Sequence, residues 1–147
     1  MKKIRLLLLL LCGVLLLAGC GEEQIPTGYV ADERVTVTVT TAPITAETEE
    51  IDFTVTNGRF KKLVMSEDCY LVQRKSENGW ENLTTDATKR IFACEIKRNK
   101  TAYVTLPVGE WYGSLESGEY RLIVSFFHNY DEAPVYGIAA FTVDPMV

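Results

Sequence analysis

The chain has 147 residues, of which 47% are hydrophobic and 24% are charged, and its formal net charge at pH 7 is −5. This length suits one domain with a core that needs no metal to support it. The acidic balance offers no basic stripe to neutralise phosphates, so we expect no nucleic-acid partner.

The first 19 residues have the layout of a bacterial secretory signal. Two lysines and an arginine within the first five residues precede an apolar stretch, which ends in Leu17-Ala18-Gly19-Cys20. That last run resembles the lipobox read by lipoprotein-processing enzymes. The stretch from Ile4 to Ala18 has 15 residues, whereas a bilayer-spanning helix needs about 20. Residues 1–19 are therefore interpreted as a cleaved lipoprotein signal peptide, in preference to an uncleaved membrane anchor or a non-lipid secretory signal.

Cys20 is the predicted lipidation site and the predicted first residue of the mature protein. A cysteine thiolate is the nucleophile that accepts a diacylglycerol, which a serine would not do. Two acyl chains such as palmitate give stable anchoring, whereas one chain is marginal. We expect the protein on the extracytoplasmic face of the cell membrane, held there through the lipid on Cys20.

Residues 20–33 are expected to be a short linker, and residues 34–147 one domain. Without residues 1–19 the chain has 12 Lys and Arg against 20 Asp and Glu, a net charge of −8. Overall charge therefore predicts no attraction to an anionic bilayer. Two basic clusters, Arg59-Phe60-Lys61-Lys62 and Lys97-Arg98-Asn99-Lys100, are each interpreted as a solvated turn.

Alternation of apolar and polar residues predicts strands through the rest of the chain. In Val35-Thr36-Val37-Thr38-Val39 one face is apolar and the other carries hydroxyl groups. Asn57-Gly58 and Asn78-Gly79 are typical turn pairs. A single helical turn is expected within residues 108–115. The predicted strands are 35–40, 51–56, 69–75, 80–83, 91–97, 102–106, 120–127 and 135–143, which together indicate an all-β sandwich.

Two of these strands carry predictions about their buried faces. Tyr120, Leu122, Val124 and Phe126 share one face of the strongest run. In the run 69–75, Cys69 shares a face with Leu71 and Gln73, and this face is expected to point inward.

The segment 115–122 looks like the entry to strand F of an immunoglobulin-type sandwich. Gly118-Glu119-Tyr120 fits a tyrosine corner, in which the tyrosine hydroxyl bonds to upstream backbone. Leu122 stands where antibody domains have a cysteine, so the antibody-type disulfide is absent.

An ordered set of short motifs over residues 35–144 resembles a bacterial immunoglobulin-like domain family of secreted and lipid-anchored proteins in Gram-positive bacteria. The resemblance implies an immunoglobulin-like sandwich of about seven to eight antiparallel strands and an extracytoplasmic location. It implies no catalytic residue, ligand or cofactor. The motifs are Phe53-Thr54-Val55-Thr56-Asn57, residues 70–75 leading to Gly79-Trp80, Trp111-Tyr112-Gly113, Leu115 and Gly118-Glu119-Tyr120-Arg121.

Cys69 and Cys94 have two open interpretations. In a non-reducing exterior they could form a disulfide that closes a loop of about 25 residues and stabilises the fold by on the order of 3 kcal/mol. They could equally be two buried free thiols that pack as small apolar side chains.

Neither a catalytic nor a metal site is predicted. His128 is the only histidine and is expected to be an exposed loop residue. A hydrolase would require it to meet a serine such as Ser125 and an acid such as Asp131. The chain has no cysteine–histidine cluster for zinc and no spaced acidic loop for calcium.

Several aromatic residues do not fit the inward alternation, among them Trp80, Trp111, Phe127 and Tyr136. Exposed aromatics on a β surface can form a contact site; alternatively the tryptophans complete the core and a loop covers Phe127. We expect a non-enzymatic binding or structural module whose partner is a protein or a cell-envelope component. The alternative is a protease-inhibitor-like domain that acts through the end loop 128–134.

Overall fold

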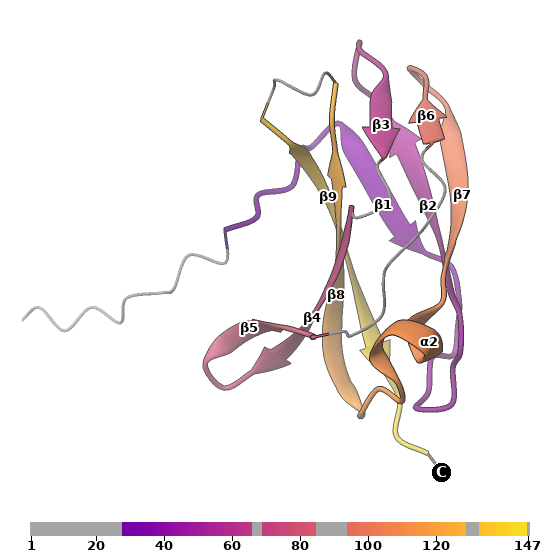
Figure 1. The fold of residues 1–147 in the computed structure, drawn as a ribbon, viewed down its shortest axis with the longest axis vertical. Helices are drawn as coiled ribbons and strands as arrows, with labels where there is room; N and C mark the ends of the chain where they lie inside the picture. The colour runs from indigo at the N-terminus through magenta and orange to yellow at the C-terminus, as the bar shows by residue number, and fades with distance from the viewer. Residues whose placement is uncertain (1–27, 66–68, 85–93, 129–132, 147) are drawn as a thin grey trace, which may run out of the picture.

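The computed structural model describes residues 28–65, 69–84, 94–128 and 133–146, and Figure 1 shows how they fold into a β-sandwich with one short helix. The signal peptide, Cys20 and most of the linker lie outside these residues, so their predictions stay predictions. The strands are β1 (Val35–Val39), β2 (Ile51–Asn57), β3 (Leu63–Met65), β4 (Tyr70–Ser76), β5 (Gly79–Asn82), β6 (Cys94–Ile96), β7 (Thr101–Leu106), β8 (Gly118–Phe126) and β9 (Val135–Val143), and the helix is α2 (Val108–Tyr112).

The strands form two facing sheets and a short ladder. One sheet has the order β1-β2-β7, the other has the order β5-β4-β8-β9, and β3 pairs with β6. Every named strand pair is antiparallel. The predicted all-β, immunoglobulin-like sandwich is confirmed. The sequence missed β3, because three residues are too few to show an alternation.

The core lies between the two sheets and comes from the alternating residues of each strand. Phe53 and Val55 of β2 are fully buried, and they belong to the same core as Leu122 and Phe126 of the other sheet. Burying one such side chain contributes roughly 1.5–3 kcal/mol. The predicted inward face of β8 (Tyr120, Leu122, Val124 and Phe126) is confirmed.

The predicted inward face of β4 is wrong. Tyr70 pairs with Val124, and Val72 pairs with Leu122; Tyr70 and Val72 belong to the core. Leu71 and Gln73 therefore lie on the outer face of the sheet. Gln73 is nonetheless buried, because the polar side chains of Arg121 and Asn82 bond to it. The two faces are hard to tell apart from sequence because each carries apolar residues.

The segment before β1 joins the second sheet. Ala31 bridges Tyr136 in parallel, and the Asp32 amide donates to the Tyr136 carbonyl at 2.8 Å. The chain then crosses to the first sheet, where β1 pairs with β2. Gly137 of β9 lets β1 pass close to β9, because a Cβ at this position would lie 2.3 Å from a methyl carbon of Val37.

The predicted tyrosine corner is confirmed. The Tyr120 hydroxyl donates to the Glu116 carbonyl at 2.7 Å. Just before this corner, the helix α2 places Val108 and Trp111 in the core. The expected helical turn is thus confirmed, and Trp111 completes the core at this end of the sandwich.

Only one of the two predicted turn pairs makes a hairpin. β4 and β5 pair around Glu77 and Asn78, and Gly79 follows with φ +114°. Gly58 makes no hairpin, since β2 pairs with β1 and β7 and the chain runs on to β3. Asn57 is instead a buried side chain that organises this end of the molecule.

Candidate binding site on the outer face of the four-stranded sheet

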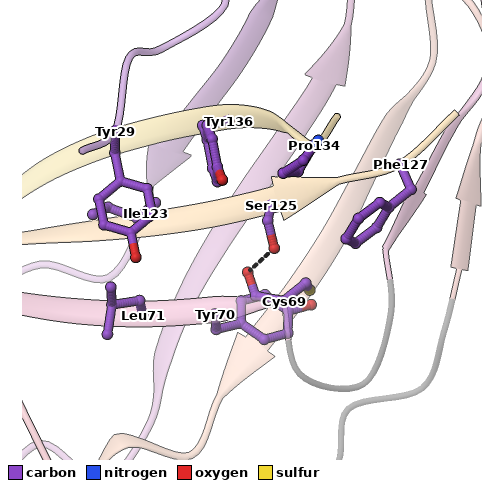
Figure 2. Close-up of a pocket in the computed structure, with 9 residues that line it drawn as sticks. All are labelled: Tyr29, Cys69, Tyr70, Leu71, Ile123, Ser125, Phe127, Pro134 and Tyr136. Carbon is purple, nitrogen blue, oxygen red and sulfur yellow. Dashed lines mark hydrogen bonds between the residues drawn. The ribbon is translucent and has the colours of Figure 1, made fainter. Parts of the chain in front are cut away.

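The outer face of the β5-β4-β8-β9 sheet holds an open pocket of about 250 Å³. Figure 2 shows its side chains, which come from the segment before β1 and from β4, β8 and β9. Most of its lining is apolar or aromatic. The lining residues, named here the outer-face pocket, are Tyr29, Cys69, Tyr70, Leu71, Ile123, Ser125, Phe127, Pro134 and Tyr136.

Register explains how these residues meet. Leu71 pairs with Ile123, and Ser125 pairs with Tyr136, so all four point away from the core. Tyr29 packs edge-on against Tyr136, with ring centroids 5.1 Å apart. The floor residue Ile123 is only 2% exposed although it lies on the outer face. The pocket is therefore a set of apolar side chains that shelter one another from water.

Ser125 supplies a polar atom to the pocket, but its hydroxyl is engaged. Figure 2 marks its hydrogen bond to the Cys69 carbonyl, at 3.3 Å. This bond ties β8 to the start of β4. The hydroxyl therefore serves to hold the pocket wall and is not placed as a nucleophile.

A polar and aromatic patch continues the same sheet face beyond the pocket. The Arg121 guanidinium lies 4.5 Å from the centre of the Trp80 ring, and its Nε donates to Gln73 Oε1 at 2.6 Å. Gln73 Nε2 in turn donates to Asn82 Oδ1 at 2.6 Å. Burial lowers the pKa of Arg121 from its ordinary value. Its buried Nη2 has no hydrogen-bond partner in the structure as described.

Trp80 is thus half-buried on the outer face, and the alternative in which it completes the core is wrong for this residue. Phe127 is also half-buried and lines the pocket. Sequence reasoning had singled out both aromatics, but it missed Arg121, Tyr29 and Ile123. No local signal marks these three, because each contacts residues that are distant in the chain. Arg121 and Trp80 are more than 40 positions apart, and Tyr29 and Tyr136 are more than 100 positions apart.

The two candidate disulfide cysteines lie near one hydroxyl. Cys69 is buried at the start of β4, and Cys94 pairs with Met65 in the β3–β6 ladder. Both thiols act on Tyr70, whose pKa is raised well above its ordinary value, first by burial and then by these neighbours. Burial also raises the pKa of Cys94. Neither cysteine is in a disulfide in the structure, and the disulfide stays a prediction that thiol labelling with and without reductant would test.

His128 is not exposed, so that expectation is wrong. The residue is 8% exposed, and its Nδ1 lies 2.9 Å from the Lys62 carbonyl oxygen. After β8, Phe127 forms a backbone bridge with Val64 of β3, and this bridge brings the next residue, His128, to Lys62. The histidine and Ser125 thus bond to different backbone carbonyls, Lys62 and Cys69.

Residues 129–132 of the end loop lie outside the described part of the chain, and the inhibitor-like alternative stays a prediction. Within the described ranges, no three or more His, Cys, Asp or Glu side chains gather in a way that could hold a metal ion. In the same ranges, no helix has the length and apolarity to cross a bilayer.

Comparison with known protein families identifies the chain's class. Residues 31–136 match the model of the bacterial Ig-like domain family. This match spans most of the chain, so the protein belongs to that family, as its motifs had suggested. No curated protein matches the chain.

Solved structures give weaker likenesses. A β-glucosidase from Kluyveromyces marxianus in complex with glucose is 16% identical, with a TM-score of 0.35 over 75% of this chain and 14% of the enzyme. The selenomethionine-labelled form of that enzyme is similar at 16% identity and a TM-score of 0.34, with the same shares covered. The chain spans a small part of that enzyme's length, and likeness at this level carries no argument about function.

Proposed function

We propose that this protein is a lipid-anchored lipoprotein on the extracytoplasmic face of a bacterial membrane, and that its Ig-like domain is a non-enzymatic module that binds a partner protein. The observation that supports partner binding most strongly is the composition of the outer sheet face. Tyr29, Tyr136, Trp80 and Arg121 gather there, and tryptophan, tyrosine and arginine are the residues that most often dominate protein interfaces.

The size of the pocket favours a protein partner over a small molecule. Small-molecule sites usually measure about 300–1,000 Å³ and enclose most of the ligand, whereas the outer-face pocket is open and has about 250 Å³. An apolar side chain of a partner would fit it as an anchor.

Site-specific photo-crosslinking tests the binding face. A photoreactive phenylalanine analogue replaces Tyr136 in one variant and Tyr103 in a matched control; Tyr103 is 84% exposed on β7 of the other sheet. We expect a discrete crosslinked protein from Tyr136 and none from Tyr103 in the native membranes. Leu71→Asp in the Tyr136 variant should abolish the product, because it places a charge in the pocket. Equal products at both positions, or a product that survives Leu71→Asp, would contradict the proposed face.

Labelling with a fatty acid tests the anchor separately. Cys20→Ser removes the thiol that would accept the lipid, and with it the residue that the lipoprotein-processing enzymes read. We expect the variant to take up no labelled fatty acid and to keep residues 1–19 as a longer, uncleaved precursor, while Cys94→Ser is labelled and shortened like wild type. A Cys20→Ser protein that still takes up the label, or a wild-type protein that does not, would rule out anchoring through this residue.

A further inference from the structure

The fold brings the two basic clusters of the sequence together at one end of the sandwich. In Figure 1 the chain leaving β2 toward β3 and the turn between β6 and β7 lie side by side at that end. Asn57 joins them: its Nδ2 donates to the carbonyls of Lys61 (3.0 Å) and Ile96 (2.8 Å). Its backbone bonds to Lys100 and Asn99. Residues 58–62 and 97–100 therefore form one structural unit, named here the basic tip.

The basic tip is strongly cationic in an acidic protein. It holds six lysines and arginines and no acidic residue. Among the contacts of the described residues, Arg59 contacts Asp32 and Lys62 contacts Glu95. Lys97, Arg98 and Lys100 are all exposed. The six cations of the tip therefore outnumber these two carboxylates.

An aromatic side chain projects from the centre of this charge. Phe60 is 75% exposed, and the Arg98 guanidinium lies 4.3 Å from the centre of its ring. An exposed aromatic ring among lysines and arginines is the combination that sits at the headgroup level of a bilayer.

The linker (residues 20–33) enters the domain at the same end. The Gly58 amide donates to the Arg34 carbonyl at 2.7 Å, and Asp32 contacts Arg59. Eight peptide units separate Cys20 from Gly28, the first described residue; they can span at most about 28 Å. A lipid on Cys20 would therefore keep this end of the sandwich near the membrane surface.

We propose that the basic tip docks on the anionic lipid surface to which the protein is anchored, with Phe60 at the headgroup level and the tip cations against the lipid phosphates. This inference rests on the proposed lipid anchor.

The opposite end of the sandwich is acidic, and segments 40–50 and 107–116 contain no basic residue. Their acidic residues are Glu47, Glu49, Glu50, Glu110 and Glu116. Lipid charge would attract one end and repel the other, so the domain would stand on the bilayer in one orientation. Asp131 and Glu132 of the β8–β9 connection lie outside the described residues.

The test uses the full-length gene with Phe60→Trp and the protein purified from bacterial membranes. The protein is reconstituted in nanodiscs of phosphatidylcholine alone or mixed with phosphatidylglycerol, with brominated lipids as quenchers. The wild-type spectrum, which contains only the signal of Trp80 and Trp111, is subtracted. We expect a blue shift and quenching of the residue-60 signal in the anionic nanodiscs, lost at about 1 M salt, where the Debye length is about 3 Å.

A charge-matched pair of variants isolates the tip. Lys97→Gln with Lys100→Gln lowers the net charge by two, and so does Lys75→Glu on β4, away from the tip. Each basic residue strengthens attraction to an anionic surface by about fivefold. We therefore expect the double variant to lower the docked-to-undocked ratio by about thirtyfold, and Lys75→Glu to leave it nearly unchanged.

Three results would overturn the proposal. The first is equal quenching of the residue-60 fluorescence in both kinds of nanodisc, and the second is an equal fall of the docked-to-undocked ratio in the two charge-matched variants. The third is a blue shift that a soluble glycerol-phosphate polymer produces and no bilayer produces. The last would assign the tip to an anionic polymer instead. Mass spectrometry of the same preparation shows whether Cys20 carries lipid. If it does not, the proposed anchor fails, and adding the same protein to anionic vesicles still tests the tip through the same fluorescence signal.

Discussion

The two ends of the sandwich differ in what holds them together and in what they present to solvent. At the basic tip, one buried polar side chain, Asn57, joins two loops through hydrogen bonds to their backbones. At the opposite end, the hydroxyls of Tyr120 and Ser114 donate to the carbonyls of Glu116 and Ala46. Apolar side chains such as Trp111 and Ile44 belong to the core at that end. The C-terminus also lies at this acidic end (Figure 1).

The comparison shows that the overall charge does not describe how charge is distributed over this protein. A chain with a net charge of −5 can carry a cationic surface at one end, because attraction to a bilayer depends on charges within about a Debye length of it.

The largest effect is expected from Asn57→Ala at the basic tip. The change removes two donated bonds and the bond that Asn57 Oδ1 accepts from the Arg59 amide at 2.8 Å. It leaves buried backbone groups without partners, so we expect the free energy of unfolding to fall by about 3 kcal/mol. Urea denaturation measures this. Asn78→Ala, in the exposed β4–β5 turn, is the control and should change stability by less than about 0.5 kcal/mol; equal losses would show that Asn57 does not organise the tip.

Tyr120→Phe at the acidic end should have a smaller effect. It removes one hydrogen bond to the Glu116 carbonyl and keeps the buried ring, which stacks on Phe141 at 5.5 Å. We expect a loss of about 1–1.5 kcal/mol in the same denaturation experiment. The exposed Tyr103 provides the control, since Tyr103→Phe should leave stability unchanged. A loss as large as that of Asn57→Ala would remove the contrast between the two ends.

A pH-dependent effect on stability is expected at Asp32, where the linker contacts the basic tip. Burial opposes ionisation of Asp32, but hydrogen bonds from Arg34 and the charge of Arg59 outweigh it and lower the pKa of Asp32 below its ordinary value of 3.8. A lowered native pKa stabilises the fold above the unfolded pKa, and this stabilisation is lost as the pH falls through the native pKa. The melting temperature of wild type should therefore exceed that of Asp32→Asn at neutral pH and converge with it in acid below pH 3.8. A difference that grows toward acid pH would contradict this sign.

The smallest effect is expected from Lys75→Gln on the outer face of β4. Lys75 contacts Glu119, and both side chains are more than half exposed. Such surface ion pairs contribute about 0–0.5 kcal/mol. Urea denaturation should barely separate the variant from wild type; a loss above about 1 kcal/mol would mean that this pair is part of a stronger network.

The regular parts of the fold were predictable because each carries a local pattern. Alternation in Val35–Val39 predicts β1, and Gly118-Glu119-Tyr120 predicts the tyrosine corner. The face of β4 was not predictable, because apolar residues occur on both faces: Tyr70 and Val72 point inward and Leu71 points outward. The basic tip and the outer-face pocket were missed for a common reason. Their residues are distant in sequence, and only strand register brings Lys61 beside Ile96 or Leu71 beside Ile123.

The lipid anchor is the claim on which both the proposed function and the docked tip depend. Mass spectrometry of the N-terminal peptide of the protein purified from its own membranes tests it most directly. The proposal predicts a peptide that begins at Cys20 and carries a diacylglycerol thioether. A mature chain that begins elsewhere, or a Cys20 peptide with an unmodified thiol, would contradict it.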